Sequence, residues 1–159
     1  MAEATFRIWR GTAEGGDYKD YKTDVTVGMV VLDAVHQVQA ESANDMAVRW
    51  NCKAGKCGSC SAEVNGKPKL MCMTRLSDLD LTKPVTIEPI KAFPVMRDLV
   101  TDISWNFEVK KHIKKFEPRE PDADDGTWRI QQDDVDRVQE FRKCIECFLC
   151  QDVCHVLRD

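Results

Sequence analysis

The stretch RWNCKAGKCGSCSAEVNGKPKLMCMT, residues 49–74, decides how the first part of this chain folds. It holds four cysteines in the spacing C-x4-C-x2-C followed by a gap of eleven residues: Cys52, Cys57, Cys60 and Cys72. Asn65-Gly66 stands between two strand-like runs, which is a strong hairpin signal. We therefore expect a cysteine-bearing loop, with the fourth thiol arriving from a separate strand.

This spacing is typical of plant-type [2Fe–2S] sites, in which a loop wraps around the cluster. Four thiolates and the bridging sulfides leave such a cluster anionic, so the loop must bring backbone N–H groups close to sulfur. Gly55 and Gly58 allow the backbone turns that this requires. Lys53 and Lys56 add positive charge nearby, which would favour the reduced state, although solvated loop lysines are the more ordinary explanation. A structural zinc site would also accept four cysteines, but it commonly uses paired C-x2-C units.

A second run, CIECFLCQDVCH at residues 144–155, carries the remaining cysteines in the spacing C-x2-C-x2-C-x3-C. In the bacterial ferredoxin run of this spacing, the first three cysteines bind one [4Fe–4S] cluster and the fourth binds a different cluster. Here His155 stands where that run has proline. His155 could bind iron, but a lone histidine is more often a hydrogen-bonding surface residue.

Zinc bound by all four cysteines of this run is the alternative. Its apolar neighbours suit a buried redox centre better: Ile145, Phe148, Leu149 and Val153. Both clusters lack ligands, because all eight cysteines of the 159-residue sequence are already assigned. We therefore expect the sequence to stop short of further cysteines.

Composition and charge exclude some classes of function. The chain has 23 basic and 27 acidic residues, a net charge of −4, with both signs interspersed. No basic face is apparent, so we do not expect a nucleic-acid partner. The N-terminus lacks the pattern of a secretion signal, and no apolar run could span a bilayer. We expect an intracellular protein with reduced thiols, which disfavours disulfides.

The hydrophobic pattern predicts an α+β fold. We expect a hairpin from residues 5–10 and 19–27, a helix over 29–40, an edge strand at 85–90 and a second helix over 95–115. An acidic loop at 117–127 should precede a helix that begins near Asp133 and leads into Cys144. The predicted domains are residues 1–95, a linking region at 96–132, and residues 133–159.

The two cysteine runs in this order resemble the iron–sulfur subunit of succinate dehydrogenase or fumarate reductase. The resemblance covers nearly the whole chain, including KAFPVMRDL at residues 91–99. It implies a β-grasp plant-type ferredoxin domain, followed by the start of an all-helical bacterial-ferredoxin-like domain. The implied ligands are Cys52, Cys57, Cys60 and Cys72 for [2Fe–2S], Cys144, Cys147 and Cys150 for [4Fe–4S], and Cys154 for [3Fe–4S].

The resemblance also implies a role. Such a subunit relays electrons from the FAD of a flavoprotein subunit, which oxidises succinate, toward quinone held by membrane anchor subunits. It would lie peripherally on the cytoplasmic face of a bacterial inner membrane or on the matrix face in a mitochondrion, and the absence of an Arg/Ser-rich transit segment favours the bacterial location. This chain alone should show no turnover. The alternatives are fumarate reduction in the reverse direction, a free ferredoxin-type carrier, and a zinc-stabilised interaction module. We expect residues 1–95 to fold around [2Fe–2S] while the segment from Asp133 onward frays.

Overall fold

The computed structural model describes residues 2–157. The chain forms two compact units, one made of Met1–Ile103 and Glu146–Asp159 and the other of Ser104–Ile145. The first unit therefore contains both the 49–74 stretch and most of the second cysteine run. The domain ranges predicted from the sequence stay a prediction, and residues 158–159 of the last range lie outside the described chain.

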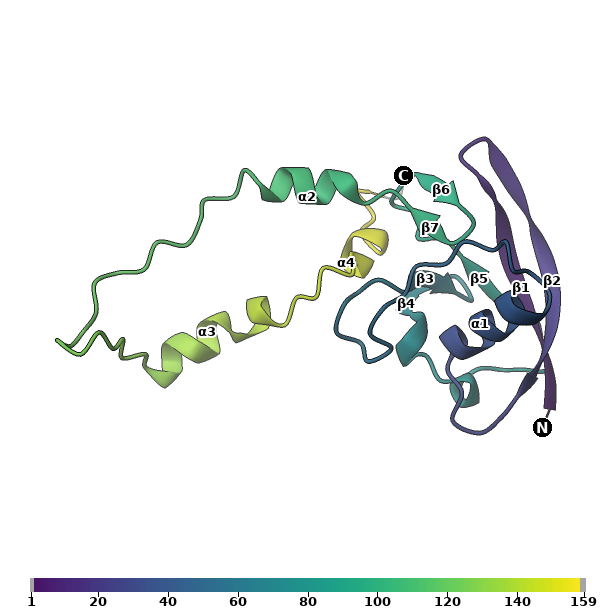
Figure 1. Ribbon diagram of the computed structural model, residues 1–159, viewed down its shortest axis with the longest axis horizontal. Helices are drawn as coiled ribbons and strands as arrows, with labels where there is room; N and C mark the ends of the chain where they lie inside the picture. Colours follow the sequence, from purple (N-terminus) through teal and green to yellow (C-terminus); the bar gives the residue numbers. More distant parts are fainter. Residues whose placement is uncertain (1, 158–159) are drawn as a thin grey trace. The chain divides into compact units, whose positions relative to one another are not determined.

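The first unit is built on a long antiparallel hairpin, β1 (Ala2–Thr12) and β2 (Gly15–Val25), joined by two residues (Figure 1). Phe6 and Ile8 on β1 are fully buried, while Arg7 between them is exposed. This alternation follows from the two-residue period of a strand. The predicted hairpin is confirmed, and it is longer than expected because Gly11 and Thr12 still pair with Gly16 and Gly15.

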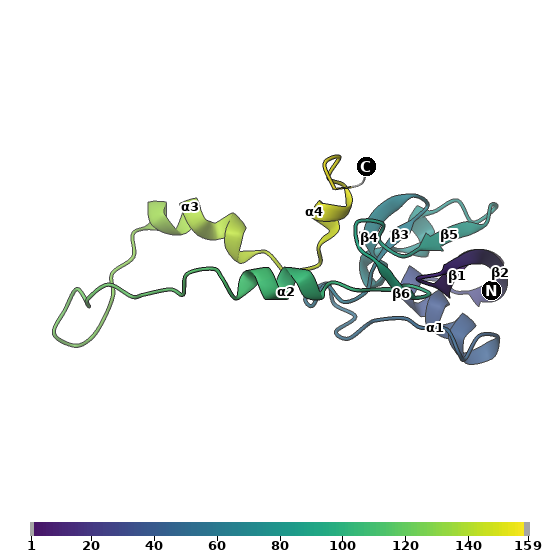
Figure 2. The same cartoon turned by 90° about the horizontal axis from the view of Figure 1, so that it is seen from above.

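Helix α1 (Val31–Glu41) packs against β2 and covers the core (Figures 1 and 2). Val31, Leu32, Val35 and Val38 are buried on one side of this helix. The spacing of these residues is that of an amphipathic helix, so the helix predicted at 29–40 is confirmed.

A second hairpin follows the cysteine loop. It pairs β3 (Ser61–Val64) with β4 (Lys67–Leu70). Asn65 and Gly66 form its turn with φ of 50° and 70°, as a two-residue hairpin turn requires. The chain then makes two short 3₁₀ turns, η1 (Met71–Met73) and η2 (Leu76–Asp78), and η1 carries Cys72.

Three further strands follow: β5 (Val85–Glu88), β6 (Val95–Arg97) and β7 (Val100–Thr101). The sheet has the strand order β4-β3-β5-β1-β6-β7, with β2 beside β1. Strand β5 (Val85–Glu88) lies parallel to β1 and antiparallel to β3. The prediction of an edge strand at 85–90 was therefore wrong. Strand β5 pairs on both sides, and Pro84 and Pro89 lie just outside it, where neither removes a hydrogen bond from the sheet.

The helix predicted over residues 95–115 was also wrong in its first half. This region forms β6 (Val95–Arg97) and β7 (Val100–Thr101), and helix α2 (Ser104–Lys110) begins only afterwards. Asp98 adopts φ of 50° between the two strands, a left-handed conformation that interrupts any helix. The Asp98 carboxylate accepts hydrogen bonds from Gly11 and Ala47, which compensates for this backbone conformation.

The second unit contains α2 and α3 (Gln132–Arg142). Asp133 and Asp134 occupy the first turn of α3, where carboxylates favour the helix N-terminus, and α3 ends just before Cys144, as predicted. Residues 111–131 contain no helix or strand, which confirms the acidic loop at 117–127. In the first unit, the short helix α4 (Leu149–Asp152) carries Cys150. Among residues 2–157, no helix is both long and apolar enough to cross a membrane.

Candidate metal centre

The loop that precedes β3 turns sharply around its cysteines. Lys53, Gly55 and Gly58 have φ of 52°, 63° and 69°. Three left-handed residues within six positions coil the backbone, and glycine adopts this conformation without strain. The turns expected at Gly55 and Gly58 are therefore present.

Backbone N–H groups of the loop point at sulfur. The amides of Ala54 and Lys56 each lie 3.3 Å from Sγ of Cys52, and the amide of Cys72 lies 3.5 Å from Sγ of Cys60. Such hydrogen bonds stabilise negative charge on a thiolate. The loop thus presents donors to sulfur, as an anionic cluster requires.

Two of the first four cysteines, Cys57 and Cys60, have shifted pKa values. A hydrogen bond from the Ser59 hydroxyl, assisted by Cys52, lowers the pKa of Cys57 to about 6. Burial raises the pKa of Cys60 to about 11; the hydrogen bond from the Cys72 amide opposes this rise, and the Cys72 and Cys57 side chains add to it. Cys60 and Cys72 are buried, whereas Cys52 and Cys57 are half-buried. The structure therefore brings Cys72 next to one cysteine of the loop, Cys60, because the Cys72 amide lies 3.5 Å from the Cys60 sulfur.

The donor set fits a [2Fe–2S] cluster. Four thiols, backbone donors to two of the sulfurs and a glycine-turned loop match the needs of an anionic cluster. Across residues 2–157, no three His, Cys, Asp or Glu side chains are grouped so that they could hold a single metal ion.

The loop is tied to α1 through side chains that the sequence did not reveal. Lys53 Nζ lies 2.8 Å from the Asp33 carboxylate and 6.0 Å from the Trp50 ring. The His36 ring meets Trp50 edge-on at 4.6 Å. Lys53 is therefore more than a solvated lysine, because it links the residue after Cys52 to α1.

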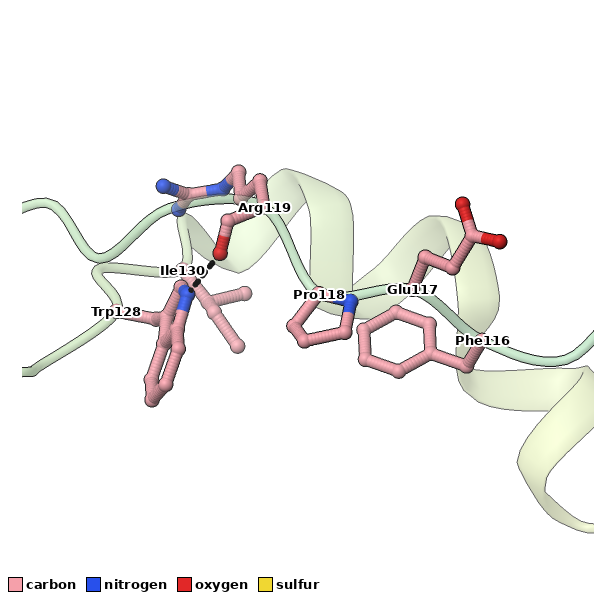
Figure 3. A pocket seen from close by; sticks show the side chains of 6 residues that line it. All are labelled: Phe116, Glu117, Pro118, Arg119, Trp128 and Ile130. Atoms are coloured by element: carbon pink, nitrogen blue, oxygen red, sulfur yellow. Dashed lines mark hydrogen bonds between the residues drawn. The ribbon is translucent and has the colours of Figure 1, made fainter.

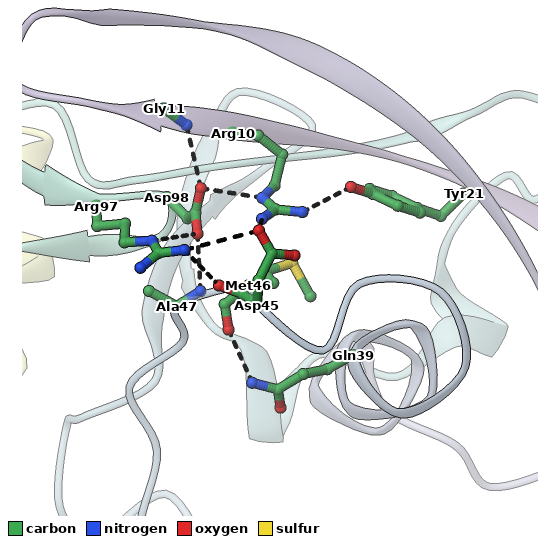
Figure 4. A network of polar contacts seen from close by, with 9 residues as sticks. All are labelled: Arg10, Gly11, Tyr21, Gln39, Asp45, Met46, Ala47, Arg97 and Asp98. Carbon is green, nitrogen blue, oxygen red and sulfur yellow. Dashed lines mark hydrogen bonds and ion pairs between the residues drawn. The ribbon is translucent and has the colours of Figure 1, made fainter.

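A buried polar network holds the chain just before the loop (Figure 4). Asp98, with 3% of its surface exposed, accepts hydrogen bonds from Nε of Arg10 at 2.9 Å and from the Ala47 amide at 2.7 Å. Arg10 also contacts Tyr21 and Asp45. These contacts join β1, β2 and the β6–β7 turn to the segment that leads into the cysteine loop.

The second cysteine run is divided between the units. Cys144 is exposed and lies at the end of the second unit, whereas the other three cysteines of the run belong to the first unit. Of those three, Cys150 is exposed and Cys147 and Cys154 are half-buried. Val153 is 61% exposed, so the apolar surroundings expected for this run are incomplete in the described chain. His155 is exposed.

A separate pocket in the second unit has a volume of about 580 Å³. Figure 3 shows its lining, where the indole N–H of Trp128 donates to the Arg119 carbonyl at 2.8 Å. Its other lining residues are Phe116, Glu117, Pro118 and Ile130. None of the lining residues is a cysteine, and the pocket contains no thiol ligand.

Residues 5–108 match the family described as 2Fe-2S iron-sulfur cluster binding domain, and the chain belongs to this family. The chain is 37% identical over 141 residues to a fumarate reductase iron-sulfur subunit of Mycobacterium tuberculosis, covering 87% of this chain and 57% of that protein. It is 30% identical to the mitochondrial succinate dehydrogenase [ubiquinone] iron-sulfur subunit of Candida glabrata, covering 94% and 61%.

A solved structure is more similar. A chain of the Mycobacterium smegmatis Sdh1 complex in the apo form superposes with a TM-score of 0.91 at 58% identity, covering 99% of this chain and 65% of that one. The predicted α+β fold with a ferredoxin-like first domain is thereby confirmed. The present chain spans between half and two thirds of the length of these relatives.

Proposed function

We propose that this chain is part of the iron–sulfur electron-transfer subunit of a succinate dehydrogenase. The observation that carries the proposal is a glycine-turned loop whose backbone amides reach the sulfurs of Cys52 and Cys60, in a family member whose relatives are named as such subunits. The bound cluster would accept and release single electrons. The protein's part is to hold the thiolates and to set their surroundings.

The backbone donors have a specific task in this role. Plant-type ferredoxin centres have reduction potentials of about −400 mV, which is too low to accept electrons from succinate. Hydrogen bonds to sulfur stabilise the extra negative charge of reduction and raise the potential. The amides of Ala54, Lys56 and Cys72 are the groups that we expect to do so.

The complete assembly follows from the same proposal. Cys144, Cys147 and Cys150 would bind [4Fe–4S], and Cys154 would bind [3Fe–4S], together with ligands supplied from beyond this sequence. A flavoprotein subunit containing FAD would deliver electrons from succinate, and membrane anchor subunits would hold the quinone that accepts them. We place the subunit peripherally on the cytoplasmic face of a bacterial inner membrane.

Anaerobic purification of the chain tests the first step. We expect iron and acid-labile sulfide, visible absorbance, and an electron paramagnetic resonance signal on reduction. Cys72→Ala should abolish the [2Fe–2S] signal, whereas Cys154→Ala, in the other cysteine run, should keep it. A colourless protein that contains zinc would contradict the proposal and support an interaction module.

Fumarate reduction is the second candidate, favoured by the 37% identity to the Mycobacterium tuberculosis subunit. The full-length protein co-expressed with its flavoprotein separates the two directions. Faster succinate oxidation with quinone than fumarate reduction with quinol supports our first choice. Failure to co-purify with any flavoprotein would favour a free ferredoxin-type carrier.

A further inference from the structure

The second cysteine run touches the first cysteine loop directly. Gly58 is buried between Cys57 and Cys60, and a Cβ atom added to it would lie 2.7 Å from Cα and 2.8 Å from the amide nitrogen of Cys147. Real Cβ atoms do not approach backbone so closely. Any side chain at residue 58 would therefore push the Cys147 backbone away.

A hydroxyl joins the same two segments. Oγ of Ser61, the first residue of β3, lies 2.8 Å from the Cys147 carbonyl oxygen and 2.9 Å from the Gly58 carbonyl oxygen. A hydroxyl has one proton, so it donates to one carbonyl at a time or is shared between the two. Ser61 thus connects the turn of the cysteine loop to the backbone of a cysteine 86 positions away.

The chain after Cys147 is anchored on its other side. The Asp152 carboxylate is fully buried and accepts a hydrogen bond from the Ala92 amide at 3.0 Å. The Phe148 ring lies 5.9 Å from that of Phe93. Glu146 and Phe148, on either side of Cys147, have φ of 55° and 58°. Such backbone conformations persist where surrounding contacts hold them in place.

We propose that Ser61 is a positioning residue that fixes Cys147 against the Gly58 turn, and so sets the separation between the two cysteine runs. The inference rests on the proposed function, in which electrons pass from one run's cluster to the next. Electron transfer slows steeply with distance, so the separation of the two ligand segments controls it. Ser61 itself touches neither sulfur nor substrate.

Hydrogen exchange of the full chain, purified anaerobically, tests the contact. The amides of residues 151–154 are bonded within the α4 turn and report on its docking. Ser61→Ala should speed their exchange about fivefold, the factor that corresponds to one ordinary hydrogen bond. Ser61→Thr retains the hydroxyl in a strand position and should restore slow exchange.

Gly58 and Gly66 offer a matched pair. Their φ values are 69° and 70°, but Gly66 has nothing within 4 Å of an added Cβ. Gly58→Ala should speed exchange at residues 151–154 by on the order of tenfold, because the inserted methyl group displaces Cys147. Gly66→Ala imposes the same backbone strain and should leave these amides unchanged. Unchanged exchange in Ser61→Ala, with Gly58→Ala responding, would overturn the role of Ser61.

A second measurement distinguishes a failure of the Ser61 positioning role from a failure of the proposed electron-transfer function. In the full-length, cluster-loaded subunit, the magnetic interaction between the [2Fe–2S] signal and its neighbour should weaken in Ser61→Ala and remain in Ser61→Thr. Equal interaction in all three proteins would overturn the positioning role. Absence of any cluster absorbance in the unaltered protein would instead contradict the proposed function, and the exchange result would still decide whether Ser61 holds Cys147.

Discussion

At the scale of single residues, Ser59 is the group whose effect on the candidate centre is easiest to isolate. Its hydroxyl donates a hydrogen bond to Cys57, and this bond is the largest contribution to the low pKa of that thiol. A donor that stabilises the thiolate also stabilises the additional charge of a reduced cluster. We expect Ser59→Ala to lower the reduction potential of the [2Fe–2S] centre in a spectroscopic redox titration. Ser77→Ala, an exposed serine outside the loop, is the control, and an unchanged potential in Ser59→Ala would refute the assignment.

Asp98 is the residue on which the polar network depends. Its side chain is 4% exposed, and it faces the Arg10 guanidinium, which is 10% exposed. Without the Asp98 charge, the largely buried Arg10 guanidinium keeps only the exposed Asp45 as an ion-pair partner and loses its buried one. Asp98→Asn should therefore lower the free energy of unfolding by about 2–4 kcal/mol, measured by urea denaturation with tryptophan fluorescence.

Asp45 provides the control for this experiment. It also pairs with Arg10, at 2.8 Å, but its side chain is 63% exposed. An exposed ion pair contributes about 0–1 kcal/mol, so Asp45→Asn should cost little. Equal losses in the two variants would show that burial of Asp98 is not the reason for its effect.

At the scale of elements, helix α1 and the cysteine loop are coupled through His36. Nε2 of His36 is buried and has no hydrogen-bond partner among residues 2–157. Burial, assisted by the charge of Lys53 and opposed by Asp33, lowers the pKa of His36 below its usual range. The folded protein therefore binds fewer protons than the unfolded chain below a pH of about 6.5.

His36 should therefore make the fold less stable at acidic pH. Above the unfolded pKa the imidazole is neutral in both states and does not oppose folding. As pH falls from about 6.5 through the lower folded pKa, the unfolded chain takes up the proton more readily, so the free energy of unfolding decreases. Urea midpoints at pH 7.5 and 5.5 should differ more in the unaltered chain than in His36→Gln. His112→Gln, at an exposed histidine, should retain the full difference. Equal pH dependence in all three proteins would exclude His36 as the cause.

The elements also show what the sequence could predict. The Asn65-Gly66 turn and the buried face of α1 could be predicted from the sequence. Asn-Gly favours the left-handed φ of a two-residue turn, and the apolar residues of α1 recur with a 3.6-residue period. The β6–β7 turn could not be predicted in this way. Met96, Leu99 and Val100 have helical spacing, but Asp98 is held by Gly11 and Ala47, which are distant in sequence. Likewise, the cysteine spacing predicts a set of candidate ligands, which stays a prediction, whereas the Ser61 contact to Cys147 depends on tertiary structure and left no mark in the sequence.

At the scale of the whole molecule, burial is unevenly distributed within the first unit. Many of the largest fully buried side chains come from the sheet and α1, including Phe6, Ile8, Leu32 and Ile87. In contrast, most residues from 50 to 57 are exposed. Residues 50–57 therefore contribute little to the hydrophobic core, although Cys60 and Cys72 are buried within it. A bound metal centre contributes its binding free energy to the segments that supply its ligands.

Removal of iron should therefore loosen one part of the molecule and spare another. After treatment with an iron chelator under anaerobic, reducing conditions, we expect amides of residues 52–60 to exchange on the order of tenfold faster, because local opening no longer breaks bonds to a metal centre. Amides paired in β1, β2 and α1 should change less than about twofold, since their protection depends on apolar packing. Hydrogen exchange with and without iron, read segment by segment, distinguishes this outcome from general unfolding. If β1 and α1 lost protection together with the loop, the metal centre rather than the apolar core would hold this fold together.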